Sequence, residues 1–194
     1  MSSLESAAMR PLGVMMCGGA LRLSQEDQLT IARWMTLKSI IGELLDKPRA
    51  VFGPAERRWF YEHREPFTTS QVFIAHCPAE PIRGFHIRAH GWAQDLQPKP
   101  EDIQFIAQFT FMKIGPVMLL SAYGKPEQME PLLFPKSISH RLDQIFAPQN
   151  SPVVWPPVYP LGLEHLEEFR SALRTWMGRP ADPPEPEIAG KFLL

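Results

Sequence analysis

The sequence predicts an α+β domain in which N-terminal helices and a C-terminal helix enclose a four-stranded antiparallel sheet. Two patterns support this class. Residues 29–45 carry apolar side chains around most of a helix, which is typical of a helix packed on several sides. Residues 71–123 instead alternate with period two in four successive segments, as strands do. Helices and strands that occur in separate runs favour the α+β class.

The N-terminal third predicts three helices. Residues 3–16 predict a short helix that Pro11 should break or kink, because proline lacks the backbone N–H of a helix. Ser24 and the acid three residues later, Asp27, resemble a capping box that opens the long helix through residue 45. Residues 54–63 predict a short third helix, because proline is favoured in the first helical turn.

The strands are expected to follow one another as a meander on the long helix. They cover residues 71–77, 82–92, 103–114 and 117–123. Gly115-Pro116 is the expected turn between the last two strands. Residues 137–146 fit neither pattern clearly, whereas residues 163–177 are amphipathic and predict a closing helix.

The composition is typical of a globular protein, except at the proline-rich C-terminus. The 194 residues are 44% apolar and 21% charged, with a formal net charge of −1. Because the net charge is so small, tight binding to nucleic acid requires that the basic residues cluster. We expect one domain over residues 1–178. Residues 179–194 are acidic and proline-rich, a composition typical of an extended or disordered tail.

The sequence indicates a cytoplasmic protein. The N-terminus lacks a signal-peptide pattern, and no stretch has the ~18 uncharged apolar residues of a membrane span. Cys17 and Cys77 are expected to stay reduced. No phosphate-binding loop, nucleophile elbow or metal-ligand spacing occurs, so we expect no cofactor and no metal.

Histidines supply the main candidate surface. Alternation places His86, Arg88 and His90 on one face of a strand, and His76 on an expected neighbouring strand can join them. On a strand, residues four apart lie ~13 Å apart, too far for easy shared binding of one zinc ion. The face is therefore a solvated surface or, as the sharper alternative, an anion- or nucleic-acid-binding surface.

Two further features have alternative interpretations. Arg33, Lys38 and Glu43 interrupt the apolar long helix, so they either extend their charged ends into water or form a buried polar network or binding site. The segment Trp155-Pro156-Pro157 is stiff and extended. It is either a strap over the core or a segment that docks onto a partner.

Several of these segments together resemble bacterial and phage HNH-endonuclease-like proteins. In that family, a cysteine-rich, treble-clef-like segment runs into C-N-N-G-W-M-S-x-L-E, followed by a helix with an R-W-x-x-K-like pattern and later a W-P-P element. The resemblance covers about residues 1–160. It rests on residues 1–5 (MSSLE), the helix over residues 29–43 with Ala32-Arg33-Trp34 and Lys38, Pro54-Ala55-Glu56-Arg57, Gly115, Gln144-Ile145-Phe146 and residues 152–157 (PVVWPP).

The resemblance implies a role without catalysis. This chain starts where the family's zinc-binding segment ends, so no metal ligand of that segment has a counterpart here. We therefore expect a non-catalytic accessory or recognition domain, encoded by a phage or mobile element, with a protein or nucleic acid as partner. The alternative is a protein-interaction module, an inhibitor or adaptor, acting through the sheet face or Trp155-Pro156-Pro157. An enzyme with a site at His76, His86 and His90 is the least favoured hypothesis.

Overall fold

The computed structural model describes residues 3–45, 51–78, 86–92, 105–124, 134–146 and 152–176, with some side chains in these ranges excepted. The α+β class is confirmed. In chain order the elements are α1 (Ser3–Met16), β1 (Leu21–Leu23), α2 (Gln25–Leu45), α3 (Pro54–His63), β2 (Gln71–His76), β3 (His86–Trp92), β4 (Phe105–Ile114), β5 (Val117–Gly124), α4 (Lys136–Ser139), β6 (Asp143–Phe146), β7 (Val153–Trp155) and α5 (Leu163–Trp176).

Over the residues that the structure describes, the main sheet has five antiparallel strands in the order β3-β4-β5-β2-β6. The expected meander is confirmed for β3, β4 and β5. It is wrong for β2, which pairs with β5 and β6 instead of β3. The physical reason lies in β2 itself. Its residues Val72, Phe73, Ile74 and Ala75 are all buried, so both faces of this strand need cover and an inner position suits it. Part of the ambiguous segment 137–146 supplies the fifth strand, β6.

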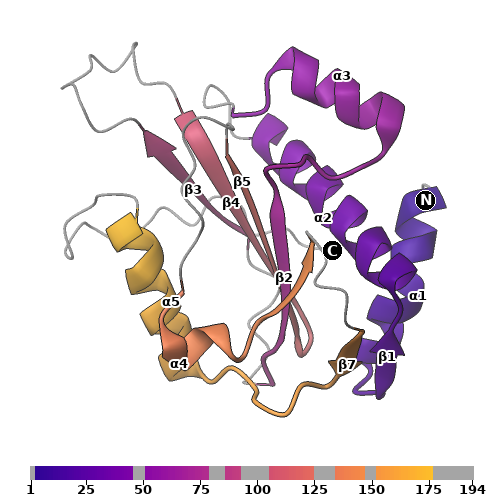
Figure 1. Cartoon of the computed structure of the whole chain (residues 1–194), viewed down its shortest axis with the longest axis vertical. Helices are drawn as coiled ribbons and strands as arrows, with labels where there is room; N and C mark the ends of the chain where they lie inside the picture. Colours follow the sequence, from indigo (N-terminus) through magenta and orange to yellow (C-terminus); the bar gives the residue numbers. More distant parts are fainter. Residues whose placement is uncertain are drawn as a thin grey trace.

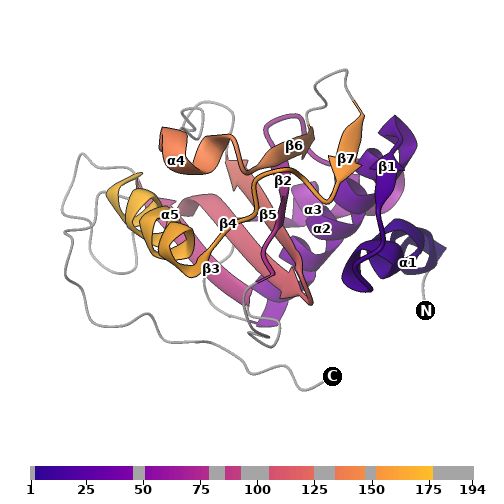
Figure 2. The ribbon, with the colours of Figure 1, turned by 90° about the horizontal axis from the view of Figure 1, so that it is seen from below.

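Helices cover both faces of this sheet, which gives three layers (Figures 1 and 2). Alternate residues of β2 point to opposite layers. Val72 and Ile74 join an apolar cluster with α1 and α2, whereas Phe73 and Ala75 join a cluster that includes Phe169 of α5. The period-two alternation of the strands thus builds two separate cores.

The predicted capping box of α2 is confirmed. The backbone N–H of Asp27 donates to Ser24 Oγ at 3.1 Å, and that of Ser24 donates to Asp27 Oδ2 at 3.0 Å. The expected break at Pro11 is wrong, because α1 is continuous from Ser3 to Met16. Three residues flanking Pro11, namely Ala8, Leu12 and Met15, are fully buried in the core shared with α2. Tertiary packing therefore outweighs the lost backbone hydrogen bond.

A third cluster joins α3 to the end of the sheet. Phe52, Phe60, Phe67 and Tyr123 are buried together beside α2. The rings of Phe52 and Tyr123 stack with centroids 4.4 Å apart, and Phe67 lies 4.9 Å from Tyr123. These contacts fix α3 on the same side of the sheet as α2 (Figure 1).

Part of the segment around Trp155, which the sequence predicts to be stiff and extended, forms the strand β7. Residues 153–155 pair antiparallel with β1, with Arg22 opposite Val154 and Leu21 opposite Trp155. This two-stranded sheet lies against the α1–α2 layer (Figure 2). Trp155 is only 1% exposed and belongs to the core around Trp34, so the interpretation of this segment as a strap over the core is confirmed.

Candidate functional site

The histidines do not form the expected cluster. Strands β4 and β5 lie between β2, which carries His76, and β3, which carries His86 and His90. Three strand spacings of about 4.8 Å place the two strands about 14 Å apart. A shared site with His76 is therefore wrong, and with it the enzyme hypothesis that used all three histidines.

The sheet register fixes only the backbone of the remaining basic residues. His86, Arg88 and His90 pair with Met112, Thr110 and Gln108 of β4. Strand β3 is an edge of the sheet in the part of the chain that the structure describes. The side chains of His86, Arg88 and His90 lie outside the described residues, so their proposed contact surface stays a prediction.

His76 lies in an apolar setting. Its ring meets Trp155 edge to face, with centroids 5.2 Å apart and an interplanar angle of 79°. Burial lowers the pKa of His76 below its ordinary value, because the partly buried ring loses hydration of its charged form. The ring is therefore neutral at neutral pH and is not a cationic contact for phosphate there.

We expect His76 to titrate below pH 6.5 in the folded chain. The unfolded chain then takes up this proton first as the pH falls, so stability is unaffected by His76 above about pH 6.5 and declines below it. Ring-proton NMR measures the midpoint, and melting temperatures at pH 7.5 and 5.5 measure the linkage in wild type and His76→Gln. A His76 midpoint at or above 6.5, or an equal acid loss in the variant, contradicts the proposed environment.

Arg33 and Lys38 of α2 form ion pairs with other parts of the fold. Arg33 forms ion pairs with Glu26, at 3.2 Å, and with Glu65 beyond α3. Its hydrogen bond to Glu65 raises the pKa of the guanidinium further. Lys38 donates to Glu5 Oε1 of α1 at 2.7 Å, and its Nζ lies 5.4 Å from the centroid of the Trp34 ring. These two candidate binding residues thus connect neighbouring elements, although each keeps part of its surface in water.

Glu43 belongs to a buried polar network, the second of the two arrangements expected for the charges of this helix. Its side chain is fully buried, and its carboxylate accepts from the backbone N–H groups of Val51 and Phe52. Arg57 of α3 lies 3.8 Å away. Because a buried charge requires partners, this carboxylate joins the end of α2 to the start of α3.

An exposed surface does occur beside the strand β7. Trp155 points inward, but Val154, Val158 and Tyr159 are 63%, 84% and 55% exposed. Two residues of the turn that follows α4 lie beside Tyr159: the His140 ring lies edge-on with centroids 5.3 Å apart, and the Arg141 guanidinium lies 6.0 Å from the ring centroid. We call these five residues the strap surface. Trp155 itself is excluded as an exposed docking anchor.

Arg141 is held in place at the strap surface. Its Nη1 donates to the carbonyl of Pro160 at 2.5 Å, and its Nε donates to the carbonyl of Ser137 at 3.0 Å. A guanidinium has five N–H donors, so three are left for other contacts. Apolar, aromatic and cationic groups in fixed positions are a combination typical of the energetically important part of protein interfaces.

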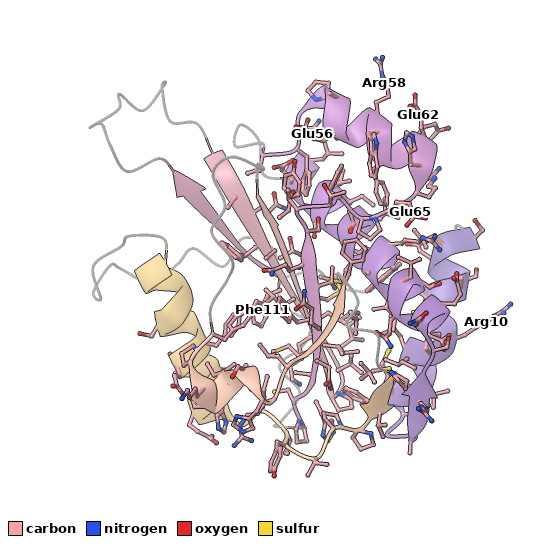
Figure 3. The ribbon with its side chains drawn as sticks, viewed as in Figure 1. Arg10, Glu56, Arg58, Glu62, Glu65 and Phe111 are labelled. Atoms are coloured by element: carbon pink, nitrogen blue, oxygen red, sulfur yellow. The ribbon has the colours of Figure 1, made fainter. Side chains whose placement is uncertain are left out.

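A second surface feature lies on the outer side of α3. A shallow hollow of about 400 Å³ is lined by Pro54, Ala55, Arg58, Trp59 and Glu62. Figure 3 shows Arg58 and Glu62 on this helix, with Arg58 pointing away from the sheet. The Trp59 ring stacks on His63 at 4.7 Å. The hollow is therefore an amphipathic surface on one helix and not an enclosed pocket.

The described residues hold no group of three or more His, Cys, Asp or Glu side chains placed to bind one metal ion. None of the helices in these ranges is both long and apolar enough to cross a membrane. Compared with known proteins, the chain matches no family model, no curated protein and no solved structure.

Proposed function

We propose that this chain is a non-catalytic recognition domain related to HNH-endonuclease-like proteins. One observation carries the proposal: segments that carry the resemblance contact one another. Glu5 of the M-S-x-L-E segment binds Lys38 of the long helix, 33 positions away, and Lys38 lies beside Trp34. Arg57 of the third segment lies 3.8 Å from Glu43 of the same helix.

The remaining segments that carry the resemblance contact the same N-terminal helices and their apolar cluster. Gly115 lies beside Met16 of α1 and adopts a left-handed φ of 56°, a backbone conformation in which a side chain would be strained. Ile145 and Trp155 share the apolar cluster of Trp34. Residues from several matched segments thus contact one another within the fold. These contacts give the residues structural roles and assign none of them a chemical role.

A domain of this kind binds and positions a substrate for a catalytic segment. We propose nucleic acid as that substrate, bound through the face that the sequence predicts for His86, Arg88 and His90. Phosphate contacts release counterions, so binding weakens as salt rises. It also tightens as the pH falls through about 6.5, where ordinary histidine side chains become charged.

Fluorescence anisotropy with labelled duplex and single-stranded DNA at low salt tests this proposal. Arg88→Ala is expected to weaken binding to all sequences alike, because phosphate contacts carry no sequence information. Arg10→Ala is the matched control, since Arg10 is exposed on α1 and points away from the sheet (Figure 3). No binding at tens of micromolar protein, or equal effects of the two variants, contradicts a nucleic-acid role for this face.

The strap surface favours a second function, a protein-interaction module. Its exposed Val154, Val158 and Tyr159 stand on a segment that Trp155 anchors from inside. A surface that is already ordered loses little conformational entropy on binding. This proposal keeps the segment expected from the sequence but assigns the contact to its outward residues instead of Trp155.

A further inference from the structure

The strap surface combines three properties that a docking site for an extended acidic segment requires. Val154 and Val158 expose apolar area, Tyr159 exposes an aromatic ring, and Arg141 holds unused donors in a fixed position. Lys136 of α4 is also exposed. A fixed guanidinium binds a carboxylate with less loss of side-chain entropy than a mobile one.

The nearby acids leave room for an incoming carboxylate. Glu168 of α5 accepts a hydrogen bond from Ser137 Oγ, and Glu164 lies 2.9 Å from His165. Glu168 thus has a hydrogen bond of its own to α4, whereas His165 Nδ1 accepts from the Gly162 N–H and gives Glu164 no donor there. On the β7 side, Arg22 is exposed opposite Val154, so this side of the surface adds a second cation.

We propose that the acidic, proline-rich segment of this chain, residues 179–194, docks on the strap surface. The proposal rests on the second function, in which this surface binds a protein segment. The sequence of the tail fits the chemistry. A polyproline II segment repeats every three residues, so Asp182 and Glu185 share one edge about 9 Å apart, and Pro183 and Pro186 share another. Carboxylates on one edge suit Arg141, and prolines on the other suit the Tyr159 ring.

The length of chain allows this contact. Helix α5 starts directly after the strap and runs 14 residues to Trp176, a length of about 21 Å. Residues 177–187 span about 34 Å when extended as polyproline II, which is enough to return along the helix. Because the tail is covalently attached, its effective concentration at the strap surface is on the order of millimolar. An outside protein must then displace the tail before it binds.

A spin label on the tail of the full chain tests the docking. Ala189→Cys supplies the attachment site, and Cys17→Ser removes the exposed native thiol, whereas Cys77 is buried. We expect the nitroxide to reduce the amide NMR signals of residues 140, 154, 158 and 159 to less than half of their diamagnetic intensity. Arg141→Gln and, independently, Val158→Glu should restore these signals, while the control Arg10→Gln should not.

The possible outcomes separate the tail from other occupants. Losses centred on another surface, or no losses beyond the tail, overturn the proposal. Losses that occur only between a labelled chain and a second, isotope-labelled chain also overturn it, because they show a second copy as the occupant. Each result leaves the DNA titration independent, since Arg88 and the duplex are not involved in the spin-label measurement.

Discussion

Replacement of Trp34 by alanine is expected to lower the free energy of unfolding by ~3–5 kcal/mol, the range for deleting a large buried aromatic side chain. Trp34 is 5% exposed and belongs to the apolar cluster that joins α1, α2 and β2. The change also removes the ring beside Lys38. Because this cluster includes Trp155, loosening it should also expose the β1–β7 sheet.

Urea denaturation followed by circular dichroism measures this loss. Tyr61→Ala is the matched control, because Tyr61 is an aromatic residue of α3 that is 70% exposed. Its effect should stay within about 0.5 kcal/mol, as for most surface substitutions. A Trp34→Ala midpoint equal to that of the wild type would show that the tryptophan does not support the core.

Glu43→Ala is expected to be the second large effect, with a loss of about 3 kcal/mol or more. The substitution leaves the N–H groups of Val51 and Phe52 without their acceptor, and it leaves Arg57 without its nearby carboxylate. Glu43→Gln keeps one acceptor oxygen and should lose less. Glu43→Ala should therefore loosen the connection between α2 and α3 before it loosens the main sheet.

Hydrogen exchange combined with thermal unfolding measures both parts of this expectation. The exposed acid of α3, Glu62, supplies the control Glu62→Ala, which should leave stability and exchange nearly unchanged. A wild-type melting temperature for Glu43→Ala would show that the carboxylate does not connect the two helices. So would faster exchange in the sheet with no change at residues 51 and 52.

Local pattern predicted the elements better than their arrangement. The box of Ser24 and Asp27, the third helix at Pro54–His63 and the turn at Gly115 all depend on neighbours in the chain, so sequence alone predicts them. The place of β2 depends on which distant strand covers its two apolar faces, and periodicity carries no such information. The strands β1 and β7 contain three residues each, which is too short for a period to emerge.

The sequence identified the segment that carries the candidate site, but it did not show which of its side chains face the core and which face outward. Sequence predicted a stiff segment at Trp155, yet only packing decides that its indole faces the core while Val158 and Tyr159 face outward. Helix rules relate charges three or four positions apart. They give no sign that Lys38 binds Glu5, or that Arg141 lies over Tyr159, because these pairs form between separate elements.

The proposal that this domain recognises nucleic acid without cutting it is tested most directly on one agarose gel. Purified chain is incubated with supercoiled plasmid at low salt in the presence of Mg²⁺, Mn²⁺ or Zn²⁺, and each sample is loaded before and after removal of the protein. We expect a plasmid that is retarded before protein removal and still supercoiled afterwards. Relaxed or linear plasmid that increases with protein concentration and disappears in a His86→Ala, His90→Ala double variant would contradict it.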